Sequence, residues 1–355
     1  MSSQTSRDVG SDRPKFMAGG GVMGESMRLL DWTATPLGAV EGWPRTLRGA
    51  VSILLASKAQ VILFAEPELV ALYNDAYAPV FGTKHPWALG KPARECWAEI
   101  WDDVLGPLFR GVLESGEAFY APDHAFYLER HGYLEETYFD VSYDPLRDEN
   151  GDACGVFCIV SETTGDVVGR RRARSLRELV ARTARAGTVE EVVTRAAETL
   201  AGYRQDLPFL LFYLVEDGGR TARLASGTGL QSDAVASPAV LACNEAMSGS
   251  WPIDEVLRDD GAVVVTDVEH RFGPLACGPY PESPRRAVAL PITPPGSAQP
   301  LGILVAGVSS RLDLSDAYRG YFDLLAATVT ASIANARAHE EERKRIEALA
   351  ELDRT

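Results

Sequence analysis

Alternating apolar and polar positions are clearest in the middle of the chain. Along residues 137–144, Thr, Phe, Val and Tyr alternate with Tyr, Asp, Ser and Asp, which is the period of a half-buried strand. We expect this strand to end at Pro145, because proline cannot donate to a strand ladder. After a polar turn, residues 153–160 are apolar on both faces, as a central strand would be. The pattern predicts a long antiparallel hairpin that ends in Glu162-Thr163-Thr164.

The chain before this hairpin predicts the rest of a first α+β domain. Pro44 stands where a helix can begin without losing a hydrogen bond, and the apolar residues after it have the spacing of an amphipathic helix. Two short apolar runs around a tight turn favour a second hairpin, over 59–65 and 69–73. The remaining expected elements are a helix over 75–81 capped by Asn74, two helical pieces over 87–116 broken at Gly106-Pro107, and a third strand over 119–127.

A helical linker is expected over residues 166–187. Apolar or small residues recur in it at the 3–4 spacing of a short coiled coil, at Ala173, Leu176, Val180 and Thr183. The run Arg170-Arg171-Arg172 is interpreted as a solvated helix face, and the alternative is a docking patch for an acidic partner.

The second half of the chain predicts another α+β domain. Thr188 and Glu191 fit the capping box at the start of an amphipathic helix. The further expected elements are strands over 209–215, 223–226, 262–266, 287–292 and 301–308, a helix over 239–247, and a long closing helix from Ser315.

Four motifs in the first half resemble a PAS domain: LYNDAYAPVFG, LGKPARE, ETYFDVSYDPLRDENG and GVFCIVSETT. The preamble DWTATPLG…WP…LR is similar to a leader found ahead of PAS domains in bacterial sensor histidine kinases. The resemblance covers about residues 25–164. It implies that Glu162 and Thr164 correspond to the Asp-x-Thr output motif of PAS sheets, with Glu in place of the usual Asp, and that these two residues transfer the signal.

The second half resembles a GAF domain over about residues 176–338, most distinctly in its final hairpin and helix. The last residues resemble the signalling helix that leaves such a domain, and Leu352–Thr355 is similar to the lead into a phosphoacceptor helix of a histidine kinase. The phosphoacceptor motif itself and the glycine-rich ATP-binding segments are absent from the sequence.

The expected fold class is therefore α+β, with two domains that each have a central antiparallel sheet flanked by helices, joined and followed by coiled-coil-type helices. The expected division is a disordered tail (1–24), a PAS domain with its leader (25–165), a helical linker (166–187), a GAF domain (176–338) and a signalling helix (339–355).

Composition narrows the function classes. The chain has 355 residues and a formal net charge of −15, which argues against nucleic acid as a partner, because nucleic-acid binders need a basic face. No apolar run approaches the ~18–20 residues of a membrane span, so we expect a cytoplasmic protein without a membrane partner. Five cysteines without paired-cluster spacing fit a reducing compartment. Cys154 and Cys158 lie roughly 13 Å apart on a strand, too far for a disulfide.

The sequence offers little catalytic chemistry. Its five histidines have no metal-site spacing, and neither a phosphate loop nor a Ser-His-Asp order is visible. A haem ligand at His124 or His131, a flavin adduct at Cys96 and bilin attachment at Cys243 or Cys277 are all disfavoured by their sequence contexts. We expect no catalytic residue, no metal and no cofactor, and the chain is not expected to be an enzyme.

Aromatic residues are the candidates for lining a ligand pocket, although the same side chains could simply fill a core. In the first domain they are Phe64, Tyr73, Tyr77, Trp101, Phe126, Tyr138 and Phe157. In the second domain they are Phe212, Tyr213, Trp251, Phe272 and Tyr280.

The resemblances imply a sensory input module of a signal-transduction protein, with a two-component sensor histidine kinase as the expected parent. The implied partners are a second copy of the chain, bound through the linker and the C-terminal helix, and a response regulator that acts with the parent kinase. The alternatives are the same module controlling a phosphatase or a diguanylate cyclase, and a stand-alone binding or dimerisation protein.

Overall fold

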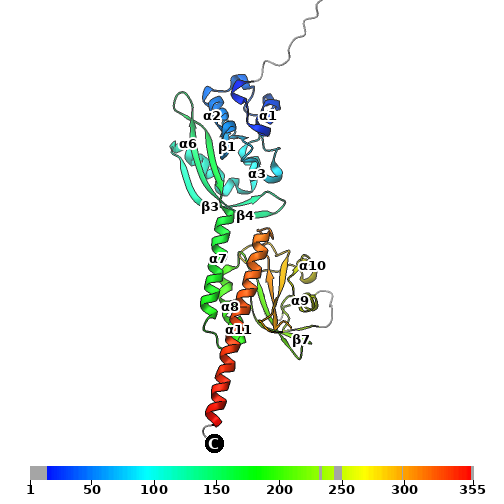
Figure 1. The fold of residues 1–355 in the computed structure, drawn as a ribbon. Helices are drawn as coiled ribbons and strands as arrows, with labels where there is room; N and C mark the ends of the chain where they lie inside the picture. The colour runs from blue at the N-terminus through cyan, green and yellow to red at the C-terminus, as the bar shows by residue number, and fades with distance from the viewer. Residues whose placement is uncertain (1–13, 232–233, 244–249, 298, 353–355) are drawn as a thin grey trace, which may run out of the picture. The chain divides into compact units, whose positions relative to one another are not determined.

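The computed structural model describes residues 14–231, 234–243, 250–297 and 299–352, with side chains to residue 347. It divides the chain into two compact units, Met1–Val167 (unit 1) and Val168–Thr355 (unit 2). Each unit has an antiparallel sheet flanked by helices (Figure 1). The expected α+β class with two such sheets is confirmed.

The sheet of unit 1 has five strands in the order β2-β1-β5-β4-β3. The strands are β1 (Gln60–Ala65), β2 (Val70–Tyr73), β3 (Phe119–Glu129), β4 (Leu134–Arg147) and β5 (Ala153–Glu162). The helices are α1 (Gly21–Leu29), α2 (Arg45–Ala56), α3 (Ala78–Phe81), α4 (Ala93–Cys96), α5 (Ala98–Ile100) and α6 (Gly106–Ser115), with a π-helical turn over Trp101–Leu105. The expected helix over 75–81 is therefore shorter, and Asn74 accepts from the Tyr77 N–H just before it.

Strand β4 runs past Pro145, where the sequence predicted its end. Pro145 pairs with Val156 of β5, whereas the ladder with β3 ends at the pair Phe119 and Tyr143. Pro145 thus has a strand neighbour on one side only, and its missing N–H costs no ladder bond there.

The N-terminal segment is ordered from Pro14, which corrects the expected disordered tail for residues 14–24; residues 1–13 lie outside the described part of the chain. The first helix, α1, is capped from a distance, because the Val22 and Met23 N–H groups donate to the Asp75 carboxylate at 3.1 and 2.7 Å. Gly21 has φ 57° and lies so close to Asp75 that a Cβ there would be 1.8 Å from Oδ2. Met23 is fully buried, so this segment of the expected tail is part of the unit 1 core.

In the described part of unit 2, the sheet has six strands in the order β8-β7-β6-β11-β10-β9. They are β6 (Leu210–Glu216), β7 (Thr221–Thr228), β8 (Val240–Ala242), β9 (Val263–Val265), β10 (Ala287–Ile292) and β11 (Gly302–Gly307). The helices are α7 (Thr164–Thr183), which begins in unit 1, then α8 (Val189–Leu200), α9 (Ile253–Asp259), α10 (Val268–Phe272) and α11 (Asp316–Leu352).

Unit 2 differs from the sequence-based expectation at two places. Residues 240–242 form strand β8, where the sequence predicted a helix over 239–247, because they pair with β7; residues 244–247 of that expected helix lie outside the described residues. The capping box is half formed: Thr188 Oγ1 accepts from the Glu191 N–H at 3.2 Å, while the Glu191 carboxylate accepts from the Gly187 N–H.

Strand β6, which forms where a strand was expected over 209–215, is buried on both faces. Leu210 and Phe212 pack against the helical layer of α7, α8 and α11, while Leu211 and Tyr213 pack on the other face with Trp251. Unit 2 therefore has two hydrophobic clusters, one on each face of its sheet.

Candidate functional site

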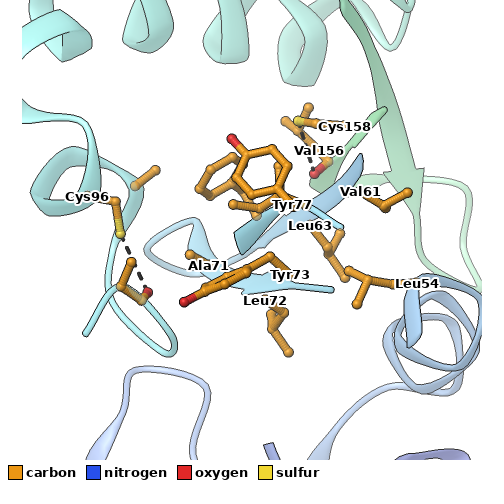
Figure 2. Packing of buried hydrophobic residues seen from close by; sticks show 14 of the residues in the cluster. Leu54, Val61, Leu63, Ala71, Leu72, Tyr73, Tyr77, Cys96, Val156 and Cys158 are labelled. Atoms are coloured by element: carbon orange, nitrogen blue, oxygen red, sulfur yellow. Dashed lines mark hydrogen bonds between the residues drawn. The ribbon is translucent and has the colours of Figure 1, made fainter. Parts of the chain in front are cut away.

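Unit 1 has a small apolar cavity between its sheet and its helices. Its volume is about 30 Å³, enough for a buried water molecule, which needs about 10–15 Å³. The residues around it are almost all apolar or aromatic: Ile62, Phe64, Tyr77, Val80, Trp97, Ile100, Leu105, Phe109, Phe126, Leu128, Phe139, Val141, Tyr143, Cys158 and Val160. Figure 2 shows part of this packed core around Tyr73 and Tyr77.

The structure brings three of the seven pocket candidates of unit 1 to this cavity: Phe64, Tyr77 and Phe126. Tyr73 is fully buried beside them, and its hydroxyl is hydrogen-bonded to His85 Nδ1 at 3.0 Å. Trp101 is half-buried and packs on Phe109 from outside the lining.

Tyr138 and Phe157 lie on the opposite face of the sheet from the cavity. In β4 the cavity is lined by Phe139, Val141 and Tyr143, and in β5 by Cys158 and Val160. Successive strand residues point to opposite faces of the sheet. Tyr138 and Phe157 are each one residue away from a lining residue, so their side chains point away from the cavity. The alternation along residues 137–144 already contained this information, and it identifies Phe139 and Tyr143 as interior residues that the candidate set missed.

The candidates in unit 2 do not share one site. Phe212 lies in the cluster under the helices, while Tyr213 and Trp251 lie on the other face of the sheet. On that face the Phe272 ring is 4.3 Å from the Trp251 ring. Tyr280 instead packs under the guanidinium of Arg311, 4.4 Å from its ring centroid.

The cavity of unit 1 is electrically neutral. Burial raises the pKa of the Tyr77 and Tyr143 hydroxyls and of the Cys158 thiol well above their ordinary values, so all three stay protonated near neutral pH. Burial also raises the pKa of Cys96 to about 12, and its thiol donates to the Ala88 carbonyl. An interior of this kind suits an uncharged occupant.

The residues expected to transfer a signal lie where β5 gives way to α7. Thr164 Oγ1 accepts from the Tyr138 N–H at 2.9 Å and is 2.9 Å from Glu162 Oε1, to which it donates. Thr163 N–H donates to the Tyr138 carbonyl. The first residue of α7 is therefore tied to β4 and to the end of β5 together.

Arg130, which the sequence analysis did not single out, organises this corner. Its guanidinium pairs with Glu135 at 2.8 Å and with Glu162 at 2.9 Å. Burial alone would lower the pKa of Arg130, but its hydrogen bonds and ion pairs with Glu162 and Glu135 outweigh burial and raise it. His131 Nδ1 also contacts Glu135 at 2.5 Å. Periodicity gave no signal for Arg130, because it follows a strand in a turn.

The sequence predicted a solvated helix face over Arg170–Arg172, and this prediction is wrong for Arg171 and Arg172. Arg171 Nε and Arg172 Nε donate to the two carboxylate oxygens of Asp206 at 2.5 and 2.9 Å. The arginine side chains are 15% and 11% exposed, and the Asp206 side chain is 1% exposed.

The described residues provide little support for a metal, haem or reactive-cysteine site. Within the ranges given above, no group of three or more His, Cys, Asp or Glu could hold a metal ion. His124 packs on Phe126, and burial lowers the pKa of its ring. All five cysteines are free thiols, and four of them are buried. No helix in the described part of the chain has the length and apolar character needed to cross a membrane.

No protein-family model and no curated protein matches the chain. Similar solved structures include the GAF domain of an Acinetobacter phosphoenolpyruvate-protein phosphotransferase (16% identity, TM-score 0.35, covering 47% of this chain and 95% of that one). They also include the GAF domain of the corresponding Coxiella burnetii protein (19%, TM-score 0.36, 48% and 96%) and free methionine-R-sulfoxide reductase from Neisseria meningitidis (18%, TM-score 0.35, 47% and 90%).

Proposed function

We propose that this chain is a sensory input module, in which a PAS-like unit 1 passes its state through α7 to a GAF-like unit 2. The observation that carries the proposal is the corner formed by Arg130, Glu162 and Thr164. There, the end of the unit 1 sheet and the beginning of α7 share hydrogen bonds. A change in the sheet that moves β4 or β5 must therefore strain the first turn of α7.

The relatedness of the two units supports the same proposal. If the strands of unit 1 are numbered along the chain, their order in the sheet is 2-1-5-4-3. Unit 2 has the same order for β6, β7, β9, β10 and β11, with β8 added at one edge. PAS and GAF domains, which the two halves resemble in sequence, are likewise both built on a central antiparallel sheet with helices on its faces.

The interior of unit 1 limits what could be sensed there. A neutral cavity of about 30 Å³ is far smaller than the 300–1,000 Å³ of sites for drug-sized ligands. We propose that unit 1 carries no bound cofactor, and that it responds to a very small uncharged molecule or to a protein partner. The module acts by binding and relay rather than by catalysis.

The relay predicts a selective effect of removing the Glu162 charge. Glu162→Gln weakens the Arg130 pair and withdraws a carboxylate from the positive N-terminus of α7. Hydrogen–deuterium exchange over residues 165–168 should therefore become several-fold faster, while Glu162→Asp, which keeps the charge, should change it little. Glu117→Gln, at an exposed glutamate of the same unit, is the control. Unchanged exchange in Glu162→Gln would contradict the relay.

We propose a two-component sensor histidine kinase as the setting, with a response regulator as the further partner, because the leader and residues 352–355 resemble those of such kinases. A phosphatase or diguanylate cyclase output, or a stand-alone binding protein, are the alternatives. The gene sequence after Thr355 decides among them: a helix with a His-Glu phosphoacceptor motif supports the kinase, and any other output rejects it.

We also propose that the chain forms a homodimer through α11. One exposed stripe of this helix carries no charged side chain from Leu324 through Ala327 and Ala331 to Ala338, and it continues past Glu342 and Arg345 to Ile346. Leu324 and Ile346 are each 57% exposed, and residues 341–347 are exposed all round. Short isolated helices are marginal in water, so a second copy packed along this stripe would stabilise the end of α11.

Ala331→Glu should convert the dimer into a monomer at tens of micromolar protein, because it places like charges opposite each other in the interface. Arg319→Glu is the control, because Arg319 lies off the exposed stripe, about 120° around α11 from Ala331, and this change should leave the dimer intact. Native mass spectrometry of freshly purified protein reports the oligomeric state and any retained ligand together. A wild-type monomer in that measurement would reject the dimer.

A further inference from the structure

The buried carboxylate of Asp206 joins the two long helices of unit 2. Asp206 follows α8 in the loop that leads into β6, and it is fully buried. An unpaired charge in such a place is costly, whereas one paired with two guanidinium groups is stabilised by charge-assisted hydrogen bonds. Arg171 and Arg172 provide that pairing from α7, and Arg171 Nη1 also donates to Gln205 Oε1 at 3.0 Å.

The pairing fixes the rotation of α7. Neighbouring residues of an α-helix point about 100° apart, so one carboxylate can meet both Arg171 and Arg172 only over a narrow range of helix rotation. A turn of α7 in either direction pulls one guanidinium away and leaves part of the buried Asp206 charge unpaired.

The same loop also holds α11. Tyr318 donates its hydroxyl hydrogen to the backbone carbonyl of Asp206 and accepts from the Ser309 N–H at 3.1 Å. The Arg172 guanidinium lies over the Tyr318 ring, 3.7 Å from its centroid, a contact that adds cation–π attraction. Asp206 is thus in contact with both helices at once.

Two further polar contacts continue the pairing of α7 and α11 within an otherwise apolar layer. Ser175 and Tyr321 hydroxyls are 2.8 Å apart, and Thr183 and Ser332 hydroxyls are also 2.8 Å apart. Ser175 and Thr183 are buried. A slip or rotation of one helix on the other would break both bonds. Ser175 and Thr183 would keep their bonds to the backbone carbonyls of Arg172 and Leu179, but the buried Tyr321 hydroxyl would lose its bond to Ser175, and a buried polar group that loses its partner is costly.

We propose that Asp206, Arg171 and Arg172 form a clamp that sets the rotation and register of α7 on α11. Asp206 is then the positioning residue through which movement of the incoming helix reaches the outgoing one. This inference rests on the proposed function only for the direction of the signal, since every contact in the clamp lies within unit 2. The two polar pairs further along α7 are consequences of the register that the clamp imposes.

The test is hydrogen–deuterium exchange of the full chain carrying Asp206→Asn, which keeps the side-chain shape and removes the charge. If the clamp sets the register, exchange should accelerate by about tenfold along α7 as far as residues 176–183, more than a helical turn beyond the altered contact. Glu216→Gln, which removes the exposed Arg223–Glu216 pair of the same unit, should change nothing in α7.

A purely local role gives a different pattern, in which faster exchange is confined to residues 168–174 and 203–209, and that result would overturn the proposal. Arg171→Gln keeps the Arg172–Asp206 pair and provides the milder variant if Asp206→Asn unfolds unit 2; its effect should be smaller but should also extend to residues 176–183. The exchange rates in these variants report only on how α7 packs within unit 2. A failed relay in Glu162→Gln would therefore leave the clamp standing, and a failed clamp would leave the relay standing.

Discussion

Arg130→Met should lower the free energy of unfolding of unit 1 by about 3–5 kcal/mol, the cost of removing one partner from a buried ion pair. The Arg130 and Glu135 side chains are only 9% and 10% exposed. Without the guanidinium, the Glu135 carboxylate stays buried without its main counter-charge. Tryptophan fluorescence during urea unfolding should report on unit 1 selectively, because five of the six tryptophans lie in it and only Trp251 lies in unit 2.

Two further variants separate the ion pair from a general loss of packing. Arg94→Met removes an exposed pair with Glu68, in which the side chains are 62% and 45% exposed, and should cost less than about 1 kcal/mol. The double variant Arg130→Met with Glu135→Met should recover much of the loss, because apolar replacements of a whole buried pair are often neutral. If Arg130→Met were no more destabilising than Arg94→Met, the corner would not be held by its charges.

The periodicity of apolar residues correctly predicted those strands and helices in which the burial of a residue follows from its position within the same element. The alternation along residues 137–144 gave the two faces of β4, and the apolar run at residues 209–215 gave a strand buried on both sides. The pairing of Thr188 with Glu191 located the start of α8. These signals are local, so a single sequence contains them.

The features that the sequence did not reveal depend on partners far along the chain. Residues 14–24 belong to the tail that was expected to be disordered, yet they are ordered, because Asp75 caps α1 from 52 residues away. Asp206 lies 34 residues from Arg172, and Arg130 meets Glu162 across 32 residues. From the sequence alone, a charged residue in a turn or on a helix is expected to face solvent, because its partner lies far away along the chain. For this reason the arginine run of α7 was predicted to be solvated, although Arg171 and Arg172 pair with Asp206.

The candidate pocket was limited in the same way. Composition identified aromatic residues, but only strand parity tells which of them face inward, and Tyr138 and Phe157 were included against that parity. Phe109, on α6, was missed because helical periodicity does not distinguish a cavity wall from an ordinary core position. Whether the interior of unit 1 binds a ligand stays a prediction, and the small cavity makes it directly testable.

Phe109→Ala should open that interior and make it bind a small apolar molecule. The Phe109 side chain is 1% exposed and its ring lies 5.1 Å from that of Phe64 and 5.3 Å from that of Tyr143. Its removal should cost about 3–5 kcal/mol, because the space left joins the existing cavity and the surrounding rings cannot all collapse into it. An enlarged apolar cavity can bind benzene, as engineered cavities of this kind do.

Benzene should then restore part of the lost stability, since a ligand that binds only the folded state raises the unfolding midpoint. The measurement is the urea midpoint by tryptophan fluorescence with and without saturating benzene, in the wild type, in Phe109→Ala and in the milder Phe109→Leu. Phe157→Ala is the matched control, because Phe157 is half-buried on the other face of the sheet and should gain nothing from benzene. An equal gain in Phe157→Ala and Phe109→Ala would show that the interior is not where the binding occurs, and would remove the basis for placing a ligand site between the sheet and α6.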